Sequence, residues 1–200
     1  MKDVKLSTFV FFTNGEVSLI HELAKIAKNN DKNKKHTYVT MDNAPDLYSW
    51  SYTCSKLREM ARFKIVEELP YDDPVAIKLA GARIRLLVFR INREYIISLS
   101  KTLNGTRFIG NDSQERNMVE LCSYMVQKNR FLLRYTEAKA IIRQTSVTLG
   151  AIEHLGLLRP VTITNTTGKY LEMTNEGIQT AKAWMEVNAI LKENDIYATA

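Results

Sequence analysis

The chain has 200 residues, of which 45% are hydrophobic and 25% charged, and its formal net charge is +6. With 8 Gly, 4 Pro and 2 Cys it has the composition of a globular protein, which excludes a collagen-like, low-complexity or disulfide-framed chain. No apolar stretch approaches the ~20 residues of a membrane span, and the apolar run at residues 9–12 is too short for a secretory signal. We therefore expect a cytoplasmic protein with no membrane partner, whose mildly basic charge suits a polyanion.

The first half of the sequence predicts alternating strands and helices. Runs of apolar and β-branched residues predict strands, and apolar residues at helical spacing predict amphipathic helices. Pro45 restricts residues 42–47 to a short helix or an irregular turn, and residues 75–80 fit either a helix or a strand. The predicted elements are strand 4–12, helix 17–28, strand 37–40, helix 49–62, strand 63–69, strand 83–91 and helix 92–103.

The second half repeats much of this order after a polar loop at residues 110–113. That loop is the best boundary between two domains, which we place at residues 1–110 and 111–200. The tetrapeptide Asn-Thr-Thr-Gly at residues 165–168 predicts the tip of a hairpin. The predicted elements are helix 113–128, extended segment 130–134, helix 136–143, helix 146–154, strand 159–164, strand 169–173 and helix 176–192.

A similar apolar phrase occurs in each half, at residues 55–66 and at residues 150–161. In both copies a short amphipathic helix stops and turns directly into a strand. Further along, each copy has a strand that leads into a closing helix, for which Asn92 and Thr174 are the predicted N-caps. Such a repeat indicates a tandem binding module rather than a single catalytic cleft. The residues expected to match in a shared core are Leu57 with Ile152, Met60 with Leu155, and Ile91 with Met173.

The second half carries a pattern that is typical of one superfamily. Residues 136–142 (Thr-Glu-Ala-Lys-Ala-Ile-Ile) precede residues 146–158, which end in Leu-Gly-Leu-Leu, and a hairpin then leads to Met-Thr-Asn-Glu-Gly at 173–177. This order resembles the winged helix-turn-helix superfamily of bacterial and phage regulators. The resemblance implies an α+β fold of two tandem winged helix-turn-helix domains, mostly helical with small β-hairpin wings. The first half fits more loosely, since Pro45 breaks its second helix and its hairpin is longer.

The resemblance also implies where DNA would bind. The second helix of each pair would enter the major groove, and the hairpin would reach a neighbouring groove or phosphate. The basic loop before residue 36 fits either a phosphate contact or a solvated surface loop. In the first half the expected contact residues are Lys34, Lys35, Ser49, Tyr52, Thr53, Lys56 and Arg58. In the second half they are Arg134, Lys139, Arg143, Ser146, Thr148, Arg159 and Lys169.

The sequence therefore predicts a DNA-binding regulator of transcription or replication, of the kind found in phages or plasmids. The alternative is a winged-helix adaptor that binds RNA polymerase or another host protein without touching DNA, for which the long first hairpin would serve as partner surface. Trp50 is expected in the core of the first half. Trp184 lies on the closing helix, and its burial by a second copy would indicate a homodimer through that helix.

We do not expect an enzyme. His21, His36 and His154 are not spaced as metal ligands, and there is no glycine-rich phosphate loop or serine nucleophile elbow. The pair Asp72-Asp73 is expected to form an ordinary turn, and Cys54 and Cys122 are expected to be small buried apolar residues. The sequence thus predicts no metal and no cofactor.

Overall fold

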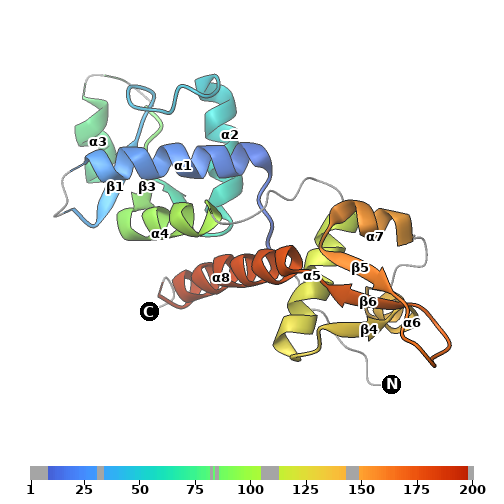
Figure 1. Ribbon diagram of the computed structural model, residues 1–200. Helices are drawn as coiled ribbons and strands as arrows, with labels where there is room; N and C mark the ends of the chain where they lie inside the picture. The colour runs from blue at the N-terminus through green and yellow to red at the C-terminus, as the bar shows by residue number, and fades with distance from the viewer. Residues whose placement is uncertain are drawn as a thin grey trace. The chain divides into compact units, whose positions relative to one another are not determined.

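A computed structural model describes residues 9–30, 34–81, 83, 86–104, 113–142 and 149–197, and these fall into two units (Figure 1). The first unit contains residues 15–104 and those from residue 189 onward, and the second contains residues 9–14 and 113–188. Each unit combines helices with one antiparallel sheet, so the predicted α+β class is confirmed.

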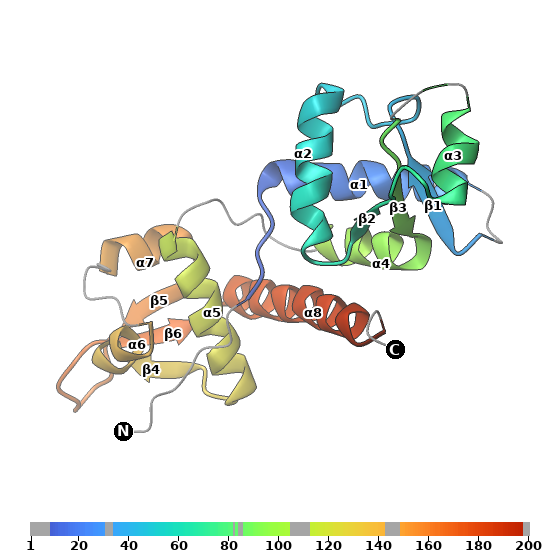
Figure 2. The ribbon, with the colours of Figure 1, turned by 180° about the vertical axis from the view of Figure 1, so that it is seen from behind.

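The first unit is built on a three-stranded sheet of order β1-β3-β2, in which Ile91 of the central strand pairs with Thr37 and with Val66. Residues 41–48, which follow β1, form turns rather than a helix. α2 and α3 lie at opposite ends of the unit (Figures 1 and 2). The elements in chain order are α1 (Asn14–Asn29), β1 (His36–Val39), α2 (Trp50–Ala61), β2 (Val66–Glu68), α3 (Pro74–Ala80), β3 (Phe89–Asn92) and α4 (Arg93–Leu103).

The core of the first unit lies between the sheet and its helices. Alternate residues of β1 and β3, such as Val39, Phe89 and Ile91, are buried on one face of the sheet. Helices α1, α2 and α4 contribute their apolar stripes to the same core, because the side chains at helical spacing share one face. Each fully buried leucine or isoleucine contributes roughly 1.5–3 kcal/mol. The helical members of the core include Leu19, Leu23, Leu57, Met60, Ile96 and Leu99.

The connection between β2 and β3 contains a short helix. Asp73 is the N-cap of α3, and its carboxylate accepts hydrogen bonds from the N–H groups of Val75 and Ala76 at 2.8 and 3.3 Å. Pro74 occupies the first turn, where a missing N–H costs nothing. The ambiguous segment 75–80 is therefore helical, and the pair 72–73 begins a helix instead of forming a simple turn. The predicted strand 83–91 was too long, since only its last three residues belong to β3 (Phe89–Asn92).

The second unit has a sheet with the same pattern of pairing as the first. Its strand order is β4-β6-β5, again with the last strand in the centre, and Leu171 pairs with Leu133 and with Pro160. Both units contain a helix, a first strand, a helix that leads into a second strand, a third strand and a closing helix. They differ in one helix each: the second unit has an additional helix (Tyr135–Ile142) after its first strand, and the first unit has α3 between its second and third strands. The elements are α5 (Ser113–Gln127), β4 (Leu132–Arg134), α6 (Tyr135–Ile142), α7 (Leu149–Leu155), β5 (Leu158–Val161), β6 (Tyr170–Met173) and α8 (Asn175–Tyr197).

The entry to α8 is held tightly against the turn between α7 and β5. Gly156 ends α7 with φ +69°, a conformation that glycine adopts without strain. The Thr174 hydroxyl donates to the Gly156 carbonyl at 2.7 Å and accepts from the N–H of Gly177 at 3.0 Å. A Cβ atom on Gly177 would lie 2.2 Å from the Leu157 carbonyl oxygen. The Thr-x-x-Gly sequence therefore caps the helix and lets it approach the turn. In the first unit Asn92 caps α4 by accepting from the Tyr95 N–H, so both predicted N-caps are confirmed.

Residues 9–13 do not form the strand predicted at residues 4–12; residues 1–8 lie outside the described part of the chain. Residues 9–13 pack in the second unit, where the Phe11 ring meets Trp184 edge-on at 5.0 Å between centroids. The Asn188 side chain accepts from the Val10 N–H at 2.8 Å and donates to the Val10 carbonyl at 3.2 Å. The expected domain 1–110 therefore does not include this segment, because its apolar side chains and backbone groups find their partners far along the sequence. The expected end of that domain at residue 110 lies outside the described residues.

The two tryptophans differ in burial. Trp184 is fully buried within the single chain, so its burial needs no second copy and the expected homodimer loses that support. Trp50 is partly buried at the start of α2, where its ring meets Phe89 edge-on at 6.1 Å between centroids.

Candidate nucleic-acid interface

Helix α2 presents one face to the core and another to solvent. Ser49 is its N-cap, and the Ser49 hydroxyl accepts from the Tyr52 N–H at 3.4 Å. Thr53, Leu57 and Met60 recur at helical spacing and are buried. The prediction that Thr53 contacts DNA was therefore wrong, because it belongs to the buried stripe. The residues exposed on the opposite stripe are Ser51, Ser55, Arg58 and Arg62.

Two tyrosines and a lysine lie beside that stripe. Tyr48 and Tyr52 are exposed, and their ring centroids are 4.7 Å apart. The Lys56 ammonium lies 5.7 Å from the Tyr52 ring and 2.6 Å from the Glu59 carboxylate, and the lysine side chain is only 18% exposed. The hydrogen bond to Glu59 raises the pKa of Lys56. Lys56 is thus held along the helix, and Tyr52 presents an exposed ring beside it.

Arg58 is paired with the strand that follows α2. Its Nε and Nη2 atoms donate to the two carboxylate oxygens of Glu68 at 2.7 and 2.8 Å. These hydrogen bonds raise the pKa of Arg58 and lower that of Glu68. Arg58 still presents an exposed edge, but its charge is partly neutralised within the chain. Arg62 at the end of α2 is also exposed, and its guanidinium lies 4.5 Å from the Phe63 ring centroid.

The predicted contacts in the second unit are spread over several elements. Arg159 of β5 is ion-paired with Glu172 at 2.6 Å, and Arg134 of β4 donates to the Tyr170 hydroxyl at 3.1 Å. Lys139 of α6 lies 5.1 Å from the Tyr135 ring centroid. The expected contacts Arg143, Ser146 and Thr148 lie outside the described residues.

The loop between β5 and β6 projects from the second unit (Figure 1). Its threonines at 162, 164, 166 and 167 are exposed, and so is Lys169 at its end. Hydroxyl and ammonium groups are donors of the kind that contact phosphate oxygens. This loop therefore presents an exposed cation, whereas the arginines of the sheet contact neighbouring side chains.

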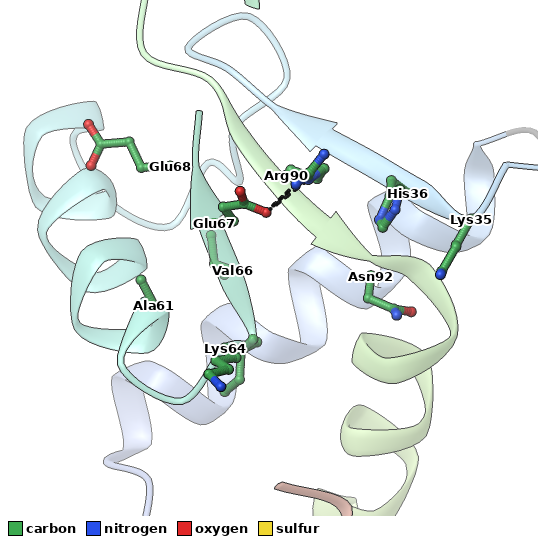
Figure 3. A pocket seen from close by; sticks show the side chains of 10 residues that line it. Lys35, His36, Ala61, Lys64, Val66, Glu67, Glu68, Arg90 and Asn92 are labelled. Atoms are coloured by element: carbon green, nitrogen blue, oxygen red, sulfur yellow. Dashed lines mark hydrogen bonds and ion pairs between the residues drawn. The ribbon is translucent and has the colours of Figure 1, made fainter. Parts of the chain in front are cut away.

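A cavity of about 690 Å³ opens in the first unit at the start of β1 and β2 and the end of β3. Glu67, Arg90 and His36 lie on the three neighbouring strands beside it (Figure 3). Lys35 lines the cavity, whereas Lys34 precedes it on the exposed approach to β1. The two predicted loop lysines therefore do not lie on the outward stripe of α2.

Sequence reasoning missed several of these residues. Once Leu57 and Met60 are placed inward, helical spacing assigns Ser55 and Arg62 to the opposite face, so that signal was available in the sequence. No local pattern reveals the cavity, because strand pairing brings its lining residues together from distant parts of the chain.

The described residues contain no group of three His, Cys, Asp or Glu side chains that could hold a metal ion. In the same part of the chain no helix has both the length and the apolar character needed to cross a bilayer. Cys54 and Cys122 are buried, and burial raises the pKa of Cys122 to about 12. Neither thiol is therefore set up as a nucleophile.

Comparison with protein-family models, with curated proteins and with solved structures found no match.

Proposed function

We propose that the chain is a duplex DNA-binding regulator built from two winged helix-turn-helix domains. The observation that carries the proposal is the repeated architecture. In each unit a helix runs directly into the second of three antiparallel strands, and the last strand lies in the centre of the sheet. This is the arrangement in which a winged helix offers one helix to the major groove and a hairpin to the backbone. The second unit has the helix pair α6 and α7 before that second strand, whereas in the first unit residues 41–48 form turns before α2 and α3 separates β2 from β3.

The first unit supplies the groove-facing helix in this proposal. The outward stripe of α2 has two small hydroxyl residues, Ser51 and Ser55, which allow close approach to base edges. Arg58 and Arg62 follow at the same spacing and can donate to phosphates or to guanine. Tyr52 adds an exposed hydroxyl and ring next to the stripe. In the second unit the loop at residues 162–169, with Lys169, serves as the backbone-contacting hairpin.

A charge on the outward stripe tests the proposal. Ser55→Glu places a carboxylate where the helix would face DNA, and Ser98→Glu makes the same change at an exposed position of α4. We expect Ser55→Glu to weaken binding to a mixed-sequence duplex by about tenfold or more, equivalent to roughly 1.4 kcal/mol. Ser98→Glu has the same net charge and should stay within about twofold to threefold of the parent. Equal affinities of the two variants would show that α2 is not the DNA-facing helix.

A protein-binding adaptor is the second candidate, and α3 favours it. This inserted helix and the loop before it leave Tyr71, Ile77 and Leu79 at 58%, 56% and 41% exposure. Tyr71 and Ile77 line a hollow of about 360 Å³ together with Ala76 and Leu86. Exposed apolar side chains beside a hollow are typical of protein contacts. If the chain fails to bind duplex DNA at low salt but binds purified RNA polymerase, and Ile77→Glu abolishes that binding, the adaptor function replaces the DNA-binding one.

A further inference from the structure

The cavity of the first unit has a cationic edge. Ala61, Ile65 and Val66 also line it, but Ile65 and Val66 are buried in the core at 1% and 3% exposure and so offer it little apolar surface. Lys35, Lys64 and Arg90 bring three cationic side chains to the same cavity from three different segments. Its volume of about 690 Å³ lies in the range of small-molecule sites, roughly 300–1,000 Å³.

The two carboxylates in the lining are each occupied by an arginine. Arg90 donates through Nε and Nη2 to one carboxylate oxygen of Glu67, at 2.9 and 2.5 Å. Glu68 is held by Arg58 in the bidentate pair described above. Arg90 keeps the donors of its Nη1 atom for another acceptor, because a guanidinium carries five N–H groups. The two arginines thus compensate the negative charge of the two carboxylates, and Lys35 and Lys64 add positive charge to the lining.

A buried histidine nitrogen in the cavity has no partner. The Nδ1 atom of His36 is enclosed and makes no hydrogen bond in the described structure. A buried polar atom without a partner costs about 1–3 kcal/mol. His36 lines the cavity next to Lys35, so a rotation of its ring would let Nδ1, when it carries the proton, donate to an anionic oxygen bound there.

Lys64, which lines the cavity, has a strained backbone conformation. Lys64 lies in the turn between α2 and β2 with φ +55°. The corresponding turn of the second unit uses Gly156 at φ +69°. Glycine adopts this conformation without strain, whereas for a residue with a side chain it costs roughly 1–2 kcal/mol of free energy. The first unit therefore places a cation beside the cavity at a position where glycine would be less strained.

We infer that this cavity binds the phosphate group of a small phosphorylated molecule of nucleotide size. The phosphate would lie against Arg90, His36 and Lys35, and the rest of the ligand would occupy the remaining volume of the cavity. Arginine and lysine donate strong charge-assisted hydrogen bonds to phosphate oxygens. The site is separate from the outward stripe of α2, so this inference does not depend on the proposed DNA binding.

Calorimetry of the full chain with inorganic phosphate, AMP and adenosine tests the inference. Phosphate and AMP should bind saturably and adenosine should not. Tighter binding of AMP than of phosphate would show that the cavity also contacts the nucleoside, and equal binding would limit the site to the phosphate group. The inference is overturned if neither phosphate nor AMP binds at concentrations up to about 10 mM, a range that detects even millimolar affinity.

Three variants separate the cavity from general charge effects. Arg90→Gln should weaken AMP binding by about tenfold or more, since it removes a charge-assisted contact. Glu67→Gln should tighten it, because it removes a competing carboxylate, and a gain cannot arise from misfolding. The control is Arg130→Gln, which breaks a bidentate pair with Glu137 in the second unit and should leave AMP binding unchanged. Unaltered affinity in Arg90→Gln would refute the site.

Two further readouts identify the ligand class. Burial, together with Arg90 and Lys35, lowers the pKa of His36 in the empty cavity, against the opposing effect of Glu67. A bound phosphate should raise that pKa, as followed by NMR of the imidazole ring, whereas an unchanged ring titration would place the phosphate elsewhere. Duplex DNA should not displace AMP. Displacement would overturn the assignment to a small molecule in favour of the nucleic-acid backbone.

Discussion

Replacing Gly177 by alanine should destabilise the second unit, although the same change normally stabilises a helix. Gly177 lies in the first turn of α8, where alanine would be favoured by up to about 1 kcal/mol on helix propensity. The added Cβ would lie 2.2 Å from the Leu157 carbonyl oxygen and 3.1 Å from the Met173 Cγ atom. Real Cβ contacts do not fall below 3.0 Å, so the helix and the turn must separate by at least 0.8 Å, the difference between 3.0 and 2.2 Å.

That separation strains the capping contacts of Thr174, because its hydroxyl joins the turn to the helix at 2.7 and 3.0 Å. Overpacking of this kind costs about 1–3 kcal/mol, and subtracting a propensity gain of about 1 kcal/mol leaves a net loss of up to about 2 kcal/mol. The control is Gly15→Ala in the first turn of α1. Its Cβ would meet the flexible end of Tyr48 at 3.3 Å, so this variant should be neutral or slightly stabilised.

The assay is urea unfolding followed by tryptophan fluorescence. Trp184 in a Trp50→Phe background reports the second unit for Gly177→Ala, and Trp50 in a Trp184→Phe background reports the first unit for Gly15→Ala, each variant being compared with its own background. The free energy of unfolding should fall for Gly177→Ala and not for Gly15→Ala. A Gly177→Ala variant that is as stable as the parent, or more stable, would refute the close approach of α8 to the turn and with it the structural reason for the Thr-x-x-Gly sequence.

Three further predictions follow from burial and titration. Phe11→Ala should red-shift Trp184 emission in the Trp50→Phe background, because it removes an aromatic contact, and should lower the free energy of unfolding by about 1–3 kcal/mol, because it removes a partly buried ring. Unchanged emission would show that the N-terminal segment does not contact α8. Cys122 should not react with a thiol reagent until the protein unfolds, because burial raises its pKa to about 12, and rapid labelling of the native chain would contradict this. Burial and Lys25 lower the pKa of His21, so the unfolded state takes up the proton first as the pH falls. The free energy of unfolding should therefore decrease from about pH 7 to about pH 5, and His21→Gln should reduce that decrease; an identical pH dependence of the two proteins would refute it.

The sequence predicted the features that depend on local patterns. Amphipathic spacing located α1, α2, α4 and α5, and the cap residues Asn92 and Thr174 marked the starts of α4 and α8. The hairpin tip near Asn165 and the end of α7 at Gly156 also follow from local backbone preferences, and both residues have positive φ. Such features were predictable because neighbouring residues largely determine them.

The remaining features depend on contacts between distant residues. Residues 9–12 look like a strand, but no strand pairs with them, and their backbone instead meets Asn188. α3 has seven residues, too few for a clear periodic pattern, so segment 75–80 stayed ambiguous. Thr53 was expected on the outer face of α2, whereas its spacing from Leu57 and Met60 places it inside, where it is buried.

The same limit applies to the candidate sites. The ion pairs of Arg58 with Glu68 and of Arg159 with Glu172 form between different elements, so the sequence overstated how much positive charge is available for DNA. The cavity at Arg90 and His36 depends on strand register, which no single segment reveals.

The central claim is that the chain binds duplex DNA, and the salt dependence of that binding tests it most directly. Fluorescence anisotropy of a labelled mixed-sequence duplex should show saturable binding at low salt. The logarithm of the association constant should then fall linearly with the logarithm of salt concentration, with a slope of about −0.9 for each phosphate contacted. A chain that shows no saturable binding at low salt, or an affinity that does not change with salt, would contradict the account.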